Sequence, residues 1–314
     1  MTTYSDSTLS LQIKEKAYEL GFDLCGIAHS RSLRERENVL KEWCRSGMNS
    51  GMSYLGRDIE KRIDPESLVP GVKSVIVTGL NYYTDKKQEE KNVPIISRYA
   101  YGHNYHDVIK KKLELMVAFV RKLKPDAEGR SFVDSEPLLE KAWAVEAGLG
   151  WQGRHSIVIN NKIGSFFFIG IILLNVELDY DEPFKENRCG NCRLCIDLCP
   201  TDAINENGTI NARKCIANLT IENREPIPEE IIPKIGGRAY GCDRCQEVCP
   251  WNKNAKSHNN PEFELRPEMK NMSAEDWLNL SREKFDRLFK GTPVERRKFE
   301  PFMNTVRIVA KPNS

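Results

Sequence analysis

The spacing of apolar residues switches between helical and extended periods along the first 180 residues of the chain. Apolar positions recur as on one face of a helix over residues 10–20 and 105–123. Short segments rich in apolar residues, which are typical of buried strands, cover residues 22–28, 72–78 and 165–176. The last run and residues 156–160 together predict a hairpin. Helices that alternate with strands favour a layered α/β domain.

The segment around Asp134 has two interpretations. Residues 130–134 predict a short strand that ends in this acid. Glu136 predicts the start of the next helix, because the proline at position 137 is tolerated in a first helical turn. An acid just before that start suits a helix N-cap. On these residues alone, a structural and a functional role for Asp134 are equally open.

Composition and charge exclude several classes of protein. The chain has 314 residues, 40% hydrophobic and 29% charged, which is ordinary for a globular protein with one large and one small domain. The net charge is +2, so any surface for nucleic acid must be local. No signal peptide is recognisable, and the longest apolar run, Phe166 to Val176, is too short to span a bilayer. We therefore expect a cytoplasmic protein.

Cysteines carry the strongest chemical signal. Eight of the ten fall in two runs, Cys189, Cys192, Cys195 and Cys199-Pro200, then Cys215, Cys242, Cys245 and Cys249-Pro250. The first run has the spacing of bacterial ferredoxins, in which the fourth cysteine of each run ligates the cluster of the other. One [4Fe–4S] cluster would thus be held by Cys189, Cys192, Cys195 and Cys249. The other would be held by Cys215, Cys242, Cys245 and Cys199.

Structural zinc and disulfides are the alternatives for these cysteines. Zinc sites also use CxxC pairs, and disulfides need an oxidising compartment, which nothing in the sequence indicates. The double run with both Cys-Pro ends favours two [4Fe–4S] clusters. Clusters alone make only an electron carrier, whereas about 180 residues of α/β pattern precede them. The residues therefore predict a redox enzyme and leave its acceptor open.

Several stretches resemble the epoxyqueuosine reductase family. They are residues 96–102 (ISRYAYG) with Tyr105-His106, 133–144 (VDSEPLLEKAWA), 148–153 (GLGWQG), 215–224 (CIANLTIENR) and both cysteine runs. The resemblance covers residues 10–255. It implies cobalamin and two [4Fe–4S] clusters, and a monomer supplied by an unidentified low-potential electron donor. It also implies reduction of epoxyqueuosine to queuosine in the tRNA anticodon loop, the last step of queuosine biosynthesis.

The resemblance also assigns roles to single residues. Asp134 matches the proton donor, and burial against the corrin would raise its pKa enough for it to donate. Cobalamin-contacting positions match Arg57, Ser97, Asp134, Val158, Ile169, Ala217, Cys242 and Asp243. A tRNA-contacting segment matches Glu222, Asn223 and Arg224. The alternatives without a function are that the apolar positions belong to the hydrophobic core and that residues 222–224 form an exposed polar loop.

The predicted organisation has three parts: an α/β cobalamin-binding domain over 1–180, a two-cluster ferredoxin-like domain over 181–255 and a basic helical extension over 256–314. The chain ends without the C-terminal helical-repeat domain that many members carry, so it resembles a short form. Phosphate contacts could come from Lys284, Arg287, Lys290, Arg296, Arg297 and Lys298, although a charge run is usually a solvated face. Alternative functions are a corrinoid reductive dehalogenase, whose typical twin-arginine signal is absent, and a non-enzymatic iron–sulfur electron carrier.

Overall fold

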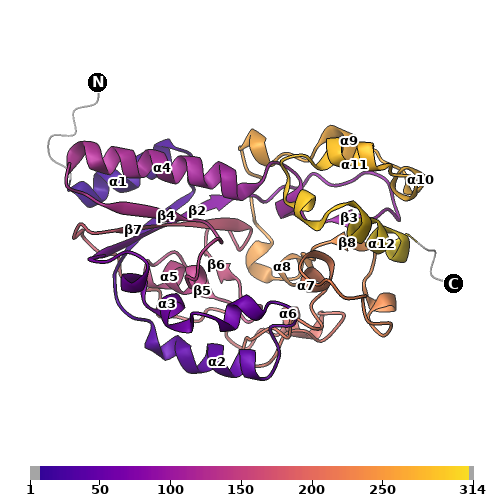
Figure 1. Cartoon of the computed structure of the whole chain (residues 1–314), viewed down its shortest axis with the longest axis horizontal. Helices are drawn as coiled ribbons and strands as arrows, with labels where there is room; N and C mark the ends of the chain where they lie inside the picture. The colour runs from indigo at the N-terminus through magenta and orange to yellow at the C-terminus, as the bar shows by residue number, and fades with distance from the viewer. Residues whose placement is uncertain (1–7, 311–314) are drawn as a thin grey trace.

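A four-stranded antiparallel sheet forms the centre of the first half of the chain in the computed structural model, which describes residues 8–310. Its spatial order is β1 (Leu24–His29), β2 (Ser74–Asn81), β7 (Phe167–Leu174) and β4 (Gly129–Phe132). Helices α1 (Leu9–Glu19) and α4 (Tyr105–Leu123) cover one face, and α5 (Glu140–Glu146) covers the other (Figure 1). This arrangement confirms the predicted layered α/β class.

The central strand β2 is buried along its whole length because both faces of the sheet are covered. Side chains alternate across a strand, so Ile76 packs in the cluster under α1 and α4, while Val75 and Val77 pack in the cluster under α5. Burial of each such side chain contributes about 1.5–3 kcal/mol. A continuous apolar run, rather than an alternating one, is the signature of this two-sided burial.

Shorter elements complete the fold. In the first half they are α2 (Glu37–Arg45), α3 (Ile59–Ile63), β3 (Ile95–Ile96), β5 (Trp151–Gln152) and β6 (Val158–Ile159). In the second half they are α6 (Leu194–Asp197), α7 (Ile216–Ile221), β8 (Arg238–Tyr240), α8 (Arg244–Glu247), α9 (Pro267–Lys270), α10 (Ala274–Leu278), α11 (Arg282–Phe289) and α12 (Phe299–Val309). Among residues 8–310, no helix is long and apolar enough to cross a membrane.

Two local predictions are wrong. The predicted hairpin does not form, because β6 pairs with β5 while β7 lies between β2 and β4. Only its turn is present, where Asn160 and Gly164 exchange backbone hydrogen bonds of 2.8 and 3.0 Å. The helix predicted to begin at Glu136 begins at Glu140 instead, and a bent segment separates it from β4.

The C-terminal helices pack into a core of their own. Its largest buried side chains include Trp277, Phe285, Phe289 and Phe302. The same cluster contains Ile96 and Tyr240, on the two strands β3 and β8 that pair in parallel. The helices therefore pack against segments from earlier in the chain, as the right side of Figure 1 shows. The residue boundaries of the three predicted domains stay a prediction.

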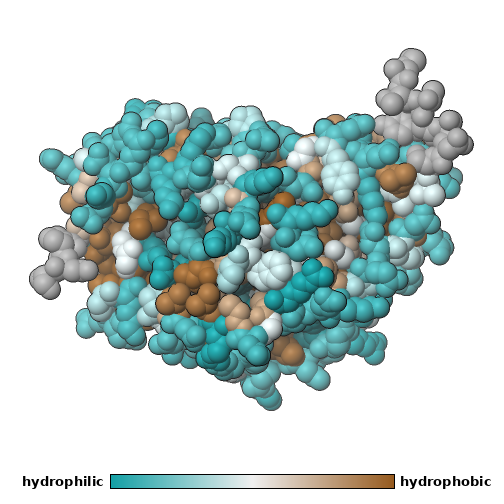
Figure 2. Space-filling view, turned by 180° about the vertical axis from the view of Figure 1, so that it is seen from behind, coloured by the Kyte–Doolittle hydropathy of each residue, from teal (hydrophilic) through white to brown (hydrophobic). Residues whose placement is uncertain are grey.

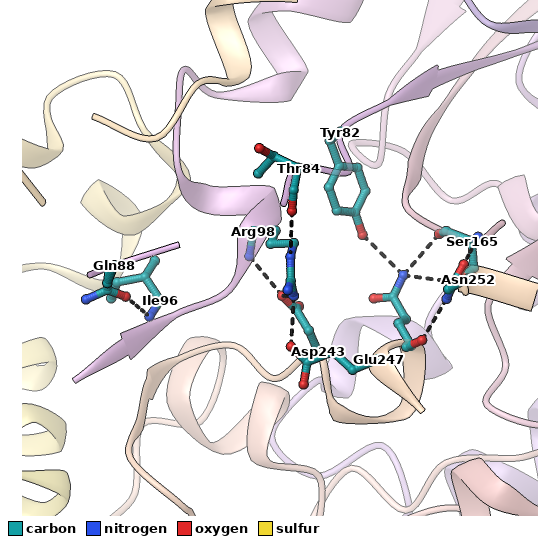
Figure 3. A network of polar contacts seen from close by, with 10 residues as sticks. Tyr82, Thr84, Gln88, Ile96, Arg98, Ser165, Asp243, Glu247 and Asn252 are labelled. Atoms are coloured by element: carbon teal, nitrogen blue, oxygen red, sulfur yellow. Dashed lines mark hydrogen bonds and ion pairs between the residues drawn. The ribbon is translucent and has the colours of Figure 1, made fainter. Parts of the chain in front are cut away.

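A buried polar network joins the sheet to the cysteine region (Figure 3). The Arg98 guanidinium donates to the Thr84 carbonyl at 3.1 Å, to Asp243 at 3.3 Å and to Glu247 at 2.9 Å. The Arg98 backbone N–H also donates to the Asp243 carboxylate, at 2.9 Å. Arg98 and Asp243 keep only 8% and 11% of their side-chain surface exposed. Charge-assisted bonds of this kind are strong because few waters compete for them.

A second set of amides extends this network. Asn252 accepts from the Ser165 backbone N–H at 2.7 Å and donates to the Gln246 carbonyl at 2.7 Å. The Gln246 side chain donates to the Ser165 carbonyl at 3.0 Å. These bonds fix the start of β7 against α8. By contrast, the outer surface on the side hidden in Figure 1 is largely hydrophilic, with scattered apolar patches (Figure 2).

Candidate active site

The eight predicted ligand cysteines lie in two neighbouring groups. The first group consists of Cys189, Cys192, Cys195 and Cys249. Burial raises the pKa of Cys195 to about 11, and the negative charges of the other three cysteines contribute to this rise. The Trp151 indole N–H lies 3.4 Å from the Cys189 sulfur. The four thiols are close enough for their charges to act on one another, which is compatible with a role as ligands of one cluster.

The second group contains Cys245, Cys242, Cys215 and Cys199. Burial raises the pKa of Cys245 well above its ordinary value, and the charges of Cys242 and Cys215 raise it further. The charge of Cys199 in turn acts on Cys215. Cys249 and Cys199 thus each lie with the other run, which agrees with the crossed pattern expected from ferredoxin spacing. The ligand assignment itself stays a prediction.

A cavity of about 600 Å³ lies beside the second group. It is lined by Met52, Tyr99, Asn104, Tyr105, His106, Asp134, Ala217, Asn218, Ile221, Glu222, Tyr240, Thr292, Pro293, Glu295 and Arg296. Ala217 is the second residue after Cys215, so the cavity borders the predicted cluster directly. Its lining combines aromatic and apolar side chains with one imidazole, that of His106, and with three acids, Asp134, Glu222 and Glu295.

Asp134 is held at the cavity wall by contacts to its side chain and to its backbone. Its carboxylate accepts from the Tyr105 hydroxyl at 2.8 Å, and the His106 Nε2 atom lies 3.8 Å from the same oxygen, beyond hydrogen-bond reach. Its backbone N–H donates to a Glu140 carboxylate oxygen at 2.5 Å. The backbone is left-handed at φ +50°, a conformation that costs about 1–2 kcal/mol for a residue other than glycine. Asp134 is therefore not the N-cap of α5, whose cap residue is Leu139.

The two carboxyl groups titrate in opposite directions. Partial desolvation at the cavity wall opposes ionisation of Asp134, but His106 and the Tyr105 hydrogen bond outweigh it and lower the Asp134 pKa. Burial, followed by the charge of Asp134, raises the pKa of Glu140 to about 8. The raised pKa predicted for Asp134 is therefore wrong in this arrangement, because the nearby His106 imidazole and the Tyr105 hydrogen bond stabilise its ionised form. The carboxyl that keeps a proton near neutral pH is Glu140.

The start of α4 is fixed by the C-terminal half of the chain. Asn104 caps the helix with its side-chain oxygen on the His106 N–H, at 3.3 Å. The His103 N–H donates to the Glu262 carbonyl at 2.6 Å, and the Asn104 N–H donates to the Gly291 carbonyl at 2.7 Å. The aromatic ring of Tyr105 then stacks on Phe168, with 4.3 Å between ring centroids. Tyr105 is thus aimed at Asp134 by contacts from β7 and the C-terminal region.

The predicted cobalamin-contacting residues fall in several places. Asp134 and Ala217 line the 600 Å³ cavity. Ser97, Cys242 and Asp243 line a second cavity of about 1190 Å³, to which residues of β3 and β8 also contribute. Three residues line neither cavity: Arg57 is exposed, Val158 is buried in β6 and Ile169 is half-buried in β7.

The predicted tRNA-contacting segment follows α7. Glu222 lines the cavity and pairs with Arg296 at 2.7 Å, and Arg224 is exposed. The Asn223 side chain is buried and donates to the Glu225 carbonyl at 2.7 Å. Arg297 is also buried and donates to the backbone carbonyl of Asn223. Its predicted role in a solvated or phosphate-binding face is therefore wrong, since its charge holds the 222–224 segment in place.

Sequence reasoning missed Glu140 and gave Tyr105 and His106 no chemical role. Glu140 follows Asp134 by six residues in the sequence. The two residues come into contact because the chain between them is bent. The start of a helix at Asn104 was readable from the sequence and could have placed Tyr105 and His106 in its first turn. Nothing in the local pattern indicates that this turn would face Asp134.

Comparison with known proteins identifies the class. Residues 62–135 match the family model described as "Epoxyqueuosine reductase QueG, DUF1730", and residues 188–252 match a "4Fe-4S double cluster binding domain". An α/β domain followed by one domain that binds two [4Fe–4S] clusters makes the chain an iron–sulfur oxidoreductase.

The relatives narrow this class to one family. The epoxyqueuosine reductase of Leadbetterella byssophila is 43% identical over 300 residues, covering 96% of this chain and 98% of the relative. That of Cellulophaga algicola is 42% identical over 287 residues, covering 91% and 93%. This chain belongs to the epoxyqueuosine reductase family.

Solved structures of the family have the same fold. The Bacillus subtilis epoxyqueuosine reductase with the Asp134 catalytic loop swung out of the active site has a TM-score of 0.89 and 30% identity, covering 96% of this chain and 80% of that one. An epoxyqueuosine reductase with an epoxyqueuosine-modified tRNA-Tyr stem loop has a TM-score of 0.85 and 31% identity, with the same coverage.

Proposed function

We propose that this chain reduces epoxyqueuosine to queuosine in the anticodon loop of tRNA, in the cytoplasm, with Asp134 as the proton donor. The observation that carries the proposal is that Asp134 and Ala217 line one cavity, which borders the second cysteine group. Family membership and the related complex with a modified tRNA stem loop support the substrate. Removal of the epoxide oxygen as water takes two electrons and two protons.

The cysteine groups supply the electrons in this proposal. The first group would receive them from a low-potential donor protein, and the second, which borders the cavity, would pass them on. The charge of Cys195 in the first group reaches Cys245 in the second, so the two clusters would be adjacent. We propose that the chain works as a monomer.

The residues around the cavity fit cobalamin. Aromatic and apolar side chains form part of its walls, and Ala217 has a small side chain near Cys215. The buried His106 Nε2 atom has no hydrogen-bond partner among the described residues. Ala217 and Asp134 would contact the cofactor from the wall of this cavity, and Ser97 and Asp243 would contact it from the second cavity. When bound, cobalamin supplies a cobalt centre that is reducible to a strong nucleophile.

Asp134 and its neighbours handle the proton. The Tyr105 hydroxyl fixes the orientation of the Asp134 carboxyl, and its hydrogen bond stabilises the ionised form left after donation. Before donation the carboxyl must be protonated. Entry of substrate, which removes water from the carboxyl, would raise its pKa toward that state. The oxygen that leaves the substrate carbon would take this proton.

The decisive experiment is Asp134→Asn in the protein loaded with both clusters and cobalamin. The amide can still accept from Tyr105 but cannot deliver a proton. We expect the variant to fold, to retain iron and cobalamin, and to lose at least about 99% of turnover, since general acid catalysis contributes about 10²–10⁴-fold. Nucleoside analysis of tRNA that carries epoxyqueuosine measures the conversion.

Controls separate the competing functions. Asp107→Asn changes an acid of the same helical turn as His106 that does not line the cavity, and it should leave turnover unchanged. Parent-like conversion by Asp134→Asn would show that another acid or water donates the proton. A protein that retains its clusters, binds no corrinoid and converts no tRNA would be an electron carrier.

A further inference from the structure

Two carboxyl groups meet where β4 leads into α5. We propose that Glu140 is a positioning residue that holds the backbone of Asp134 and so keeps the Asp134 carboxyl at the cavity. The proposal rests on the proposed role of Asp134 as proton donor, and it adds the group that keeps this donor in place. Glu140 itself is not on the cavity wall.

The geometry of the loop requires such a group. Asp134 stands at φ +50°, a conformation that Asp adopts more readily than most residues with a Cβ but still at a cost, so contacts from the surrounding structure help to hold it there. The Asp134 N–H donates to Glu140 Oε1 at 2.5 Å. Glu140 is the first residue of α5, whose buried side chains anchor it to the sheet. A rigid helix therefore supplies the acceptor for a strained residue of the loop.

The side chain and the backbone of Asp134 are held by different elements. Tyr105 on α4 holds the carboxyl, while Glu140 on α5 holds the N–H. The other acid of the loop, Glu136, pairs with Arg130 at 2.8 Å instead. Loss of Glu140 would leave Tyr105 as the sole side-chain hydrogen bond on Asp134 among the described residues, and the strained backbone could relax.

The protonation state of Glu140 adds a second effect. With its pKa raised to about 8, Glu140 carries a proton near neutral pH beside the ionised Asp134. Two interacting carboxyls titrate as a pair, so this pair carries one proton over the range in which the enzyme would act. Glutamine at position 140 would keep the acceptor oxygen and remove this titration.

The test compares three variants of the cluster-loaded protein: Glu140→Ala, Glu140→Gln and, as a matched control in the same loop, Glu136→Ala. Hydrogen–deuterium exchange of the peptide over residues 133–139, without cobalamin or tRNA, measures directly how often the backbone of the loop opens. We expect about tenfold or faster exchange in Glu140→Ala and parent-like exchange in the other two. Iron content and circular dichroism verify folding, and Glu140→Met, which fills the same space, replaces Glu140→Ala if that variant does not fold.

Turnover gives the second reading. Glu140→Ala should lower kcat about 2–10-fold, the equivalent of one neutral hydrogen bond, with KM for tRNA nearly unchanged. Glu140→Gln should restore most of kcat but change its pH profile between about pH 7 and 9. Parent-like exchange and kcat in Glu140→Ala would overturn the proposal. Faster exchange in Glu140→Ala together with parent-like turnover in Asp134→Asn would instead retain the positioning role and reject the proton donor.

Discussion

The Arg98 network and the Asp134 loop are both polar clusters built around a carboxylate, and they are held very differently. Asp243 is almost fully buried and accepts from both the backbone and the guanidinium of Arg98. Asp134 keeps 66% of its side-chain surface exposed, rests on one hydrogen bond from Tyr105 and has a strained backbone. The chain thus fixes the residues beside the cysteine groups and leaves its proposed acid on a segment that can move.

The difference follows from what each region has to do. Electron transfer needs fixed distances, so a rigid, fully paired network suits the boundary between α8 and the sheet. An acid that must meet a bulky tRNA nucleoside needs an entrance, and a loop with few contacts opens at low cost. In one related structure, that of the Bacillus subtilis enzyme, the catalytic loop is swung out of the active site. Three changes break or sharpen this contrast.

The largest effect is expected from Cys199→Ala, which changes the rigid region around the cysteine groups. Because Cys199 lies with Cys215 and not with its own run, its loss should remove the cluster at Cys215, Cys242 and Cys245 and abolish turnover. Iron quantification and electron paramagnetic resonance would measure the loss of one cluster of two. Cys44→Ala, a thiol on α2 outside both groups, is the control. Selective loss of the cluster at Cys189, Cys192 and Cys195 would refute the crossed pattern.

Arg98→Met tests the stability of the fixed region. The variant leaves the Asp243 carboxylate buried without its cation, and such losses destabilise proteins by about 3–5 kcal/mol. Urea unfolding of the cluster-loaded protein measures the difference. Arg282→Met, which removes an exposed i,i+4 pair with Asp286 on α11, should change the free energy of unfolding very little. Equal losses in the two variants would mean that the Arg98 network does not hold the regions together.

The smallest effect is expected at the rim of the cavity. Replacing both Arg296 and Lys298 by alanine should weaken tRNA binding and reduce the slope of log affinity against log salt by about 1–2, if each meets one phosphate. Both side chains are exposed, whereas Arg297 between them is buried and should be left intact. Fluorescence anisotropy with a tRNA stem loop over a salt series measures the slope. An unchanged slope would identify these residues as a solvated face.

The sequence predicted the features that depend on local patterns. The buried strand β2, the capped helix α4 and the cysteine spacing all follow from residues close together in the chain. The failures lie where distant residues decide. β7 does not form the predicted hairpin with β6 because it pairs with β2 and β4. Asn252, far away in the sequence, also binds the turn residue Ser165. The sheet is antiparallel throughout, so the rule that site residues collect at the ends of parallel strands does not explain the position of Asp134.

The Asp134 environment could not be predicted for the same reason. Its pKa depends on Tyr105 and His106, about thirty residues earlier, and its backbone depends on Glu140 across a bend. Proline at position 137 is compatible with a first helical turn, but the bond from Asp134 to Glu140 favours a later start for α5. A helix-start signal gives a probable position and does not exclude a competing tertiary contact.

The anchoring of α4 by Glu262 and Gly291 has a consequence for the order in which the protein is made. The α/β layer can fold as it leaves the ribosome, since domains fold from the N-terminal side during synthesis. The N–H groups of His103 and Asn104 then still lack the two carbonyls that receive them, because those residues are synthesised last. Tyr105 is therefore aimed at Asp134 only when the chain is almost complete. We expect ribosome-bound nascent chains that stop before Gly291 to carry the sheet without a finished active site.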